Sequence, residues 1–311
     1  MFTAKKRGRL AVLGAVVIGA TVALAGCSSS NPLSSGSTSG TSSKSGTIVI
    51  GSQQYYSDTI VAEAYAQALE NAGFTVKRSF NIGQRNVYLP ELASGKIDLI
   101  PDYSGNLLQY YDAKTTASSE SDIESALPGV LPKGLKVLKA APATDQDTYT
   151  VTKEFSTKNN ITSLDQLKDY SGSLTVGANS EFQTRPYGIP GLKSDYGVTA
   201  SLKAIADSGG PLTVAALKNG QVQLADIYSA DPAIKANDFV SLKDPKNMIL
   251  PQHIIPVADK KVNAKATAVI EKVNAALTQS ELISLNSKSV NDKQSAAVIA
   301  KAFLKSAGIL K

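Results

Sequence analysis

The chain has 311 residues, a formal net charge of +6, one histidine, one cysteine and no tryptophan. Its length suggests two domains of about 150 residues each. Residues 1–26 contain four basic and no acidic residues, so without them the net charge falls to +2, which excludes the strongly basic surface of a nucleic-acid-binding protein. A single histidine excludes a histidine-rich zinc site, and a single cysteine excludes a disulfide within the chain.

The first 26 residues have the layout of a secretory signal. A basic start precedes an almost wholly apolar run, Leu10–Ala25, which is shorter than the ~20 residues that a membrane-spanning helix needs. The run closes in Leu24-Ala25-Gly26-Cys27, which resembles the bacterial lipoprotein signal, in which the cysteine is lipidated and becomes the mature N-terminus. We therefore expect residues 1–26 to be removed and Cys27 to anchor an extracytoplasmic chain to the outer face of the cell membrane.

The segment after the cysteine differs sharply from the rest of the chain. Ser28–Gly46 consists mostly of Ser, Gly, Thr and Asn. Such a composition buries too little apolar surface to fold. Residues 27–46 are therefore predicted to be the lipid-anchor cysteine followed by a flexible linker, with an r.m.s. reach of roughly 20–25 Å.

From Thr47 onward, short apolar runs alternate with helical patterns. The order strand, helix, strand, helix, strand in residues 47–100 predicts a parallel α/β sheet. The alternation recurs in residues 163–227, where a capping box, Ser163-x-x-Gln166, is expected to open a helix. The expected strands are 47–51, 74–77, 96–100, 174–177 and 222–227, and the other expected helices are 57–73, 87–93, 214–218, 262–277 and 299–304.

Two α/β units followed by helices occur in many enzymes and also in the two-lobed solute-binding proteins that deliver ligands to importers. The sequence contains no Gly-x-Ser-x-Gly elbow, no Gly-x-x-x-x-Gly-Lys-Ser/Thr loop and no Gly-x-Gly-x-x-Gly after the first strand. A Ser-His-Asp triad would have to include His253. Carboxylates are numerous, but no spacing singles out a catalytic pair. We therefore predict a binding protein and not an enzyme.

Three tyrosines, Tyr103, Tyr149 and Tyr228, lie beside predicted strands in polar surroundings. Ligands collect at the carboxyl ends of strands in open α/β sheets. The face of an aromatic ring attracts a cation such as a quaternary ammonium by roughly 0.5–2 kcal/mol. Arg185 precedes Pro186 and so lies outside a regular helix, where its guanidinium can grip a carboxylate. Structural tyrosines and a solvated surface arginine are the alternatives that these residues alone leave open.

Five sequence blocks carry a family resemblance. They are Ile48-Val-Ile-Gly-Ser, Leu92-Ala-Ser-Gly-Lys-Ile-Asp-Leu-Ile-Pro-Asp-Tyr-Ser-Gly-Asn, Ala143-Thr-Asp-Gln-Asp-Thr-Tyr, Phe182-Gln-Thr-Arg-Pro-Tyr-Gly-Ile-Pro-Gly-Leu and Ala225-Asp-Ile-Tyr-Ser-Ala-Asp. In this order and spacing they resemble the glycine betaine/carnitine/choline-binding proteins of osmoprotectant ABC importers. The resemblance extends from about Thr47 to the C-terminus. It implies an α/β, two-lobed, periplasmic-binding-protein-like (type II) fold with a hinge of two crossover segments. Lobe I would be residues 47–147 plus 254–311, and lobe II residues 148–253.

The resemblance also implies which residues surround a cationic group. Tyr103, Tyr149 and Tyr228 fall on the aromatic cage, and the main-chain carbonyl near Asp147 lies beside the cation in relatives. The fourth cage position falls on His253. A neutral imidazole offers a ring face there, whereas a protonated one would repel a cation. The alternative for His253 is that its ring merely packs.

Three further residues are assigned to the polar end of the ligand. Arg185 falls on the arginine that grips the ligand carboxylate, and Asn106 falls on a polar helper, where the family often has Thr. Gln53 occupies a place where the family commonly carries Lys. A neutral amide donates hydrogen bonds without the charge, so a weaker affinity for a carboxylate is expected. The departures at Gln53 and His253 leave the identity of the solute open.

The resemblance implies a solute-binding lipoprotein of an ABC importer that captures quaternary ammonium osmoprotectants and needs no metal or cofactor. The expected partners are a small quaternary-ammonium or zwitterionic solute, a membrane permease with a separate ATPase, and the membrane itself through Cys27. The chain is expected to be a monomer and to bind no nucleic acid. Two alternatives remain open: the same fold binding another zwitterion or a phenolic compound, and an adhesion or signalling lipoprotein without transport.

Overall fold

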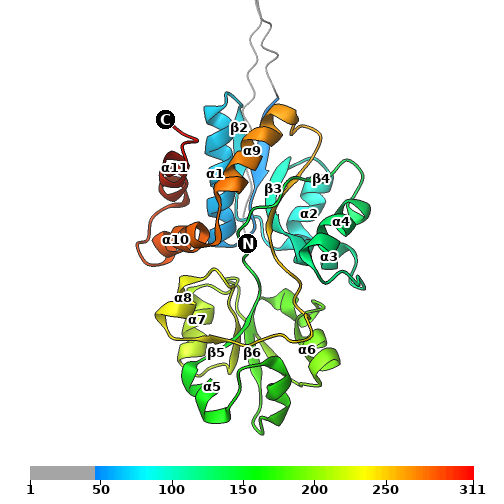
Figure 1. The fold of residues 1–311 in the computed structure, drawn as a ribbon, viewed down its shortest axis with the longest axis vertical. Coiled ribbons are helices and arrows are strands. Elements are labelled where there is room, and N and C mark those ends of the chain that lie inside the picture. The colour runs from blue at the N-terminus through cyan, green and yellow to red at the C-terminus, as the bar shows by residue number, and fades with distance from the viewer. Residues whose placement is uncertain (1–45) are drawn as a thin grey trace, which may run out of the picture. The chain divides into compact units, whose positions relative to one another are not determined.

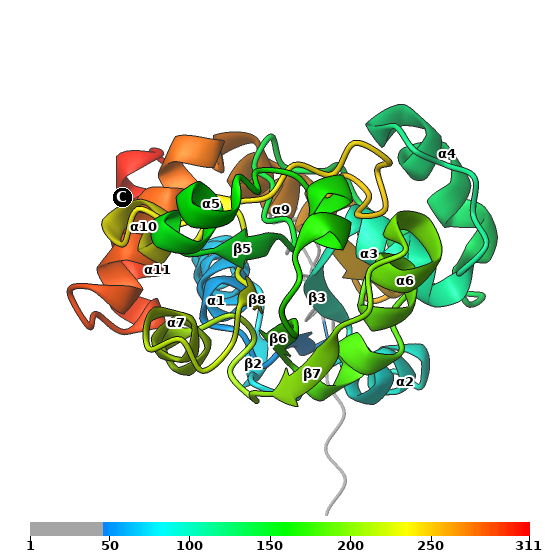
Figure 2. The same ribbon diagram turned by 90° about the horizontal axis from the view of Figure 1, so that it is seen from below.

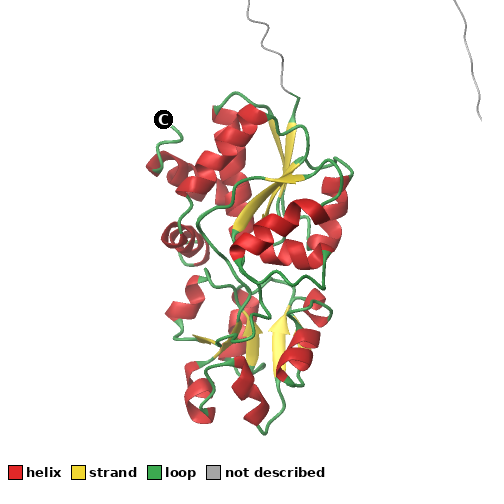
Figure 3. Ribbon diagram, turned by 45° about the vertical axis from the view of Figure 1, so that its right-hand side comes forward, coloured by secondary structure: helices red, strands yellow, loops and turns green. Residues whose placement is uncertain are grey.

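The computed structural model describes residues 46–311, which form two five-stranded sheets flanked by helices (Figures 1 and 3). The first sheet has the strand order β2-β1-β3-β10-β4, and the second has the order β7-β6-β8-β5-β9. The predicted α/β class is confirmed. The predicted signal, Cys27 and the linker up to residue 45 lie outside the described residues. None of the helices in the described part has the length and apolar character of a membrane-spanning segment.

The first sheet and its helices come from both ends of the described chain, blue to green and orange to red in Figure 1. Helix α1 has the predicted apolar stripe, which buries Ile60, Tyr65 and Leu69 against α9 and α11. The elements are β1 (Ile48–Gly51), α1 (Tyr56–Asn71), β2 (Val76–Ser79), α2 (Arg85–Ala93), β3 (Leu99–Tyr103), α3 (Ser104–Tyr111), α4 (Glu120–Val130), β4 (Lys136–Val137), β10 (Ile254–Ala258), α9 (Ala264–Ala276), α10 (Gln279–Val290) and α11 (Ala296–Ser306).

The second sheet is formed by the middle of the chain, and Figure 2 shows α6 and α7 on opposite sides of its strands. Its core contains Val176, Phe182 and Leu192, all almost fully buried. The elements are β5 (Tyr149–Val151), α5 (Lys153–Asn159), β6 (Thr175–Ala178), α6 (Ile189–Tyr196), β7 (Ser201–Ala204), α7 (Pro211–Lys218), β8 (Leu224–Asp226), α8 (Pro232–Ala236), β9 (Val240–Ser241) and two 3₁₀ helices, Leu164–Asp169 and Ser180–Gln183.

The capping box predicted at Ser163 is wrong. Only a short 3₁₀ helix follows Ser163, whose side chain makes no capping hydrogen bond. The Gln166 side chain instead accepts a hydrogen bond from the backbone N–H of Thr162, at 2.8 Å. A capping box does form at the start of α4, where Ser119 and Asp122 satisfy each other's backbone N–H groups.

Two crossing segments connect the sheets, one between β4 and β5 and the other between β9 and β10. They touch each other, because Thr144 and His253 form an isolated antiparallel bridge and the Asp145 N–H donates to the Gln252 carbonyl at 3.1 Å. The predicted lobe limits, 147/148 and 253/254, fall at the ends of these segments and stay predictions. Strands β1 and β3 are parallel, as are β6 and β8, so their carboxyl ends lie at one edge of each sheet.

Candidate functional site

A small cavity lies where loops from both sheets meet the first crossing segment. It is lined by Gln53, Tyr55, Gln84, Arg85, Tyr103, Asn106, Asp145, Asp147, Arg185 and Tyr228. Six of the eight ligand-binding residues predicted from the sequence are therefore brought together at one place. These six are Gln53, Tyr103, Asn106, Asp147, Arg185 and Tyr228.

The topology explains why residues so far apart in the sequence converge. Gln53 follows β1, Tyr103 ends β3 and Tyr228 follows β8, so all three lie at carboxyl ends of parallel strands. Asp147 precedes β5, which runs antiparallel to β8, so its amino end lies at the same edge. Arg185 comes from the loop between the second 3₁₀ helix and α6.

The aromatic part of the cavity consists of Tyr55, Tyr103 and Tyr228. The rings of Tyr55 and Tyr228 meet edge to face, with centroids 4.7 Å apart and an interplanar angle of 79°. Tyr55 was not predicted from the sequence, although it lies only two residues after Gln53. The signal that could have identified it is its position just after the first strand, because ligands bind at the carboxyl ends of strands in open α/β sheets.

Two predicted cage residues do not line this cavity. The Tyr149 hydroxyl donates to the backbone carbonyls of Tyr187 and Gly188, each at 3.0 Å, and its ring packs in the second core. The His253 ring is engaged at the crossing segments, with Nδ1 2.9 Å from the Ala141 carbonyl oxygen and Nε2 3.2 Å from the Glu120 carboxylate. Neither side chain is brought together with the other predicted ligand residues.

Both guanidinium groups of the cavity already have protein partners. Arg185 donates from Nη2 to the Gln84 side-chain oxygen at 2.8 Å, and its Nη1 lies 3.8 Å from the Asp147 carboxylate. Arg85 donates to Asp102 from Nη2 at 2.6 Å and from Nε at 3.1 Å, and both side chains are almost fully buried. A ligand carboxylate would therefore have to compete with these contacts.

Buried carboxyl groups surround the cavity. Asp145 accepts hydrogen bonds from the Tyr55 hydroxyl at 2.8 Å and from the Ala230 N–H at 2.9 Å, yet burial raises the pKa of its carboxyl to about 7. Burial and the neighbouring Asp147 carboxylate raise the pKa of Asp226 well above its usual range. Asp147 Oδ1 and both carboxyl oxygens of Asp226 are buried and accept no hydrogen bond from any residue of the range 46–311. Groups of this kind are costly to leave uncompensated.

The raised pKa of Asp145 predicts that the protein loses stability as the pH rises from about 4 to about 7. Its folded-state pKa of about 7 exceeds the ordinary value of 3.8, so in this window the folded state holds a proton that the unfolded chain releases. The Asp145 contribution to the unfolding free energy should fall by about 1.4 kcal/mol per pH unit. Urea unfolding at several pH values measures this slope. Asp145→Asn should flatten it, whereas exposed Asp169→Asn should keep it; equal slopes in both variants would contradict the assignment.

The cavity is small because the two halves of the molecule touch around it. The volume that the centre of a water molecule can occupy is only about 10 Å³, so the cavity holds about one water molecule. Gln84 Nε2 donates to the Ser208 hydroxyl at 2.9 Å, the Ser208 hydroxyl donates to the Gln54 carbonyl at 3.1 Å, and the Tyr56 hydroxyl donates to Asp231 at 2.8 Å. A trimethylammonium group therefore requires these contacts to open. A cavity of about 340 Å³ adjoins this one and shares Arg85, Asn106 and Arg185 in its lining.

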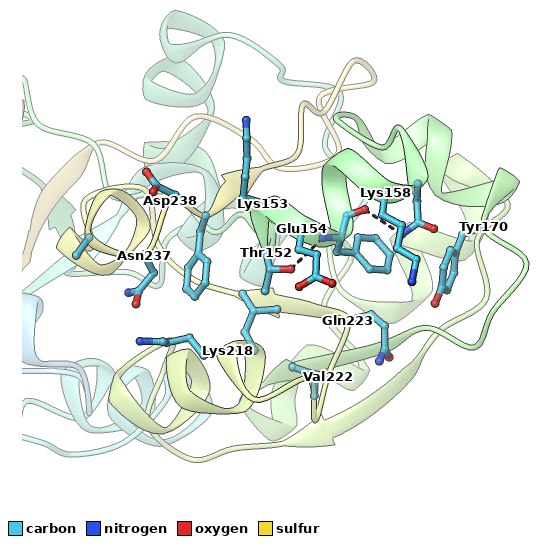
Figure 4. Close-up of a pocket in the computed structure, with 16 residues that line it drawn as sticks. Thr152, Lys153, Glu154, Lys158, Tyr170, Lys218, Val222, Gln223, Asn237 and Asp238 are labelled. Atoms are coloured by element: carbon cyan, nitrogen blue, oxygen red, sulfur yellow. Dashed lines mark hydrogen bonds between the residues drawn. The ribbon is translucent and has the colours of Figure 1, made fainter.

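A second, larger cavity is a less suitable site. It has a volume of about 670 Å³ and lies among α5, α7 and the loop after α8 (Figure 4). Lys153, Lys158 and Lys218 extend along its rim. None of its lining residues has a buried polar side-chain atom without a partner, whereas the small cavity has Gln53 Nε2 and Asp147 Oδ1. These unpaired buried polar atoms favour the small cavity over the larger one as the candidate site.

Comparisons with known proteins give the family and the relatives of this chain. Residues 46–306 match the family described as the substrate binding domain of ABC-type glycine betaine transport systems. The glycine betaine-binding protein YehZ of Escherichia coli is 23% identical over 279 residues, covering 85% of this chain and 92% of that protein. A glycine betaine/carnitine/choline ABC transporter structure has a TM-score of 0.67 at 21% identity, covering 85% of this chain and all of the other. Lactococcal OpuAC, closed on glycine betaine, has a TM-score of 0.62 at 16% identity, with 84% and 95% coverage.

Proposed function

Because this chain belongs to the family of substrate-binding domains of ABC-type glycine betaine transport systems, we propose that it captures a quaternary ammonium solute in the cavity lined by Tyr55, Tyr103 and Tyr228. The family resemblance predicted from the sequence and the two-lobed periplasmic-binding-protein-like fold are confirmed. The family consists of solute-binding proteins of transporters, so the prediction that the chain is not an enzyme is also confirmed.

One observation carries the proposal: residues from six separate segments, between Gln53 and Tyr228, converge on one buried cavity with three tyrosines and two carboxylates. A quaternary ammonium has no N–H to donate, so ring faces and nearby negative charge are what recognise it. Gln53 Nε2 has no hydrogen-bond partner in the described part of the chain and can donate to the polar end of the solute. Asn106 is already bound to Asp147 Oδ2 at 2.6 Å, and so positions that carboxylate beside the cation.

Capture is proposed to work by closure of two lobes, 47–147 plus 254–311 and 148–253, about the crossing segments. Contacts that exist only around the closed cavity, such as Gln84 with Arg185 at 2.8 Å, would be made or broken with each cycle. A solute that bridges both lobes shifts the population toward the closed form. The loaded protein, a monomer, would then deliver the solute to a membrane permease driven by a separate ATPase.

The test is calorimetric titration of residues 46–311 with choline, carnitine and glycine betaine. Saturable one-to-one binding of at least one of them is expected. The matched control is 3,3-dimethyl-1-butanol, which has the shape of choline without its charge and should bind much more weakly. Absence of heat and of thermal stabilisation with all three ammonium compounds would overturn the proposal, and binding of a different zwitterion or of a phenolic compound would then identify the other solute class.

The proposed membrane anchor depends on Cys27, so Cys27→Ser should block lipidation of the exported protein. The thiol is the atom that would carry the lipid, and serine cannot replace it in thioether formation. Incorporation of an alkyne-labelled fatty acid by growing cells measures the modification directly. Ser28→Ala is the matched control and should keep the label. Persistent labelling of the Cys27→Ser protein would show that the anchor lies elsewhere.

A further inference from the structure

Buried carboxyl groups outnumber buried guanidinium groups around the proposed solute cavity. All the groups concerned are less than a tenth exposed, except that the Arg185 side chain is 13% exposed. The two guanidinium groups belong to Arg85 and Arg185, and Asp145 and Asp147 are the carboxyl groups that line the cavity. The other three carboxyl groups each lie against a lining residue: Asp58 against Gln53, Asp102 against Arg85 and Asp226 against Asp147. Five acidic groups against two basic ones leave a deficit of positive charge inside the molecule.

The deficit is local to one part of the cavity. Asp102 is neutralised by Arg85 at 2.6 Å, and Arg185 is the nearest cation to Asp147, at 3.8 Å. Within the described residues, Asp145 has hydrogen-bond donors but no cationic partner, and Asp226 has no ion-pair partner and lies against the Asp147 carboxylate. A carboxyl group in such surroundings is either protonated and neutral, or ionised with a bound cation beside it.

The geometry points to an exchange of a proton for a cation. We propose that the cavity selects a singly positive quaternary ammonium ion without a carboxylate, such as choline, over a zwitterion, and that the bound cation displaces a proton from the buried carboxyl groups of Asp145 and Asp226. The inference rests on the proposed function, because it concerns the same cavity. Charge balances in the exchange: one organic cation enters, one carboxylic O–H bond breaks, and the proton passes to water.

A zwitterion is disfavoured for a second reason. Its carboxylate would enter a site that already holds excess carboxylates, and both guanidinium groups of the lining are engaged with Asp102, Gln84 and Asp147. The unpartnered amide of Gln53 can donate to a hydroxyl as readily as to a carboxylate, but it supplies no charge. A hydroxyl-bearing cation therefore satisfies the cavity better than a carboxylate-bearing one.

The direction of the pH effect follows from the groups that face the carboxyls. Burial and neighbouring carboxylates favour the protonated form of Asp145 and raise its pKa, whereas an ammonium ion beside it favours the ionised form. Choline affinity should therefore rise with pH up to about 7, by up to tenfold per pH unit for each proton released. The charged and titratable groups that face this cluster are Asp58 of α1, Asp102 and Tyr103 of β3, Arg85 of α2, Asp147 and Arg185 from the loops, Asp231 before α8, and the phenols of Tyr55, Tyr56, Tyr187 and Tyr228.

The experiment titrates residues 46–311 with choline and with glycine betaine at pH values of about 5.5, 6.5 and 7.5, each in two buffers of different ionisation enthalpy. The difference between buffers counts the protons released. We expect choline to bind at least tenfold more tightly than glycine betaine near pH 7.5, to lose that advantage toward pH 5.5, and to release a proton where glycine betaine releases fewer.

The possible outcomes separate the two proposals. Failure of both compounds to bind would overturn the proposed function together with this inference. Binding of both with no proton release, or tighter binding of glycine betaine at every pH, would overturn the inference and leave the function standing. Asp145→Asn should reduce proton release and flatten the pH dependence for choline, and the exposed substitution Asp169→Asn should leave both unchanged. Because proton release is measured on the unaltered protein, the test does not depend on the variant folding.

Discussion

Replacement of Arg85 by alanine should destabilise the protein by about 3–5 kcal/mol, the usual cost of removing one partner of a buried ion pair. The Asp102 side chain is 0% exposed and the Arg85 side chain 7%. The Tyr88 hydroxyl, which donates to Asp102 at 2.7 Å, would remain its only side-chain partner. Alanine would therefore leave a carboxylate buried without a counter-charge. Urea unfolding at neutral pH without added solute measures the loss.

Lys96 offers a control for Arg85. Its ammonium nitrogen lies 4.0 Å from the Glu91 carboxylate, and the two side chains are 71% and 32% exposed. Water compensates for the loss of an exposed pair, so Lys96→Ala should cost less than about 1 kcal/mol. If the two alanine variants were equally stable, the buried pair would not be the stabilising element assumed here. Replacing Arg85 and Asp102 together by Met and Leu should recover part of the loss, because no isolated charge remains.

Replacement of Tyr228 by alanine should weaken choline binding by about 2- to 30-fold, which corresponds to the roughly 0.5–2 kcal/mol that one ring face contributes to a bound cation. Tyr228 follows β8 and its ring packs edge to face on Tyr55 at 4.7 Å. Alanine removes one wall of the cavity and also one of the two rings, Tyr56 and Tyr228, that meet the Tyr55 ring edge to face. Calorimetric titration with choline measures the change.

The phenylalanine variant separates the ring from the hydroxyl. Tyr228→Phe keeps the ring face and should stay within about threefold of the unaltered protein, since the cation interacts with the ring and not with the O–H group. Tyr170→Ala, a substitution in the second core away from the cavity, should leave affinity unchanged. Equal affinities for Tyr228→Ala and the unaltered protein would remove Tyr228 from the site.

The elements of the fold were predictable where a local pattern is strong. The apolar stripe of α1 predicts a helix that the structure places at Tyr56–Asn71, and the run from Val262 to Leu277 predicts α9. Strand limits were less accurate: β3 spans Leu99–Tyr103 instead of 96–100. Pairing with β1 and β10 decides where the strand begins and ends, and a single sequence contains no direct signal of those partners.

The site residues show the same contrast between local motifs, which the sequence contains, and long-range packing, which it does not reveal. Gln53, Arg185 and Tyr228 lie at loop positions that family motifs identify, and the structure brings them together. Tyr149 also follows a motif, but its ring direction depends on packing against Phe182, which lies far away in the sequence. Tyr55 was missed for the opposite reason, because only the approach of Asp145 and Tyr228 from other segments makes it part of the cavity.

The order of the first sheet also determines when it can form during synthesis. Its fourth strand, β10, lies between β3 and β4 and pairs Ile254 with Tyr103. Until residue 258 has left the ribosome, β3 and β4 have no strand between them, whereas all five strands of the second sheet, which ends at Ser241, have already been made. The first sheet therefore begins to be synthesised first but is completed last. Pairings between residues distant in the sequence also form slowly and leave strand edges unpaired in the meantime. The chain therefore stays incompletely folded through most of its translation.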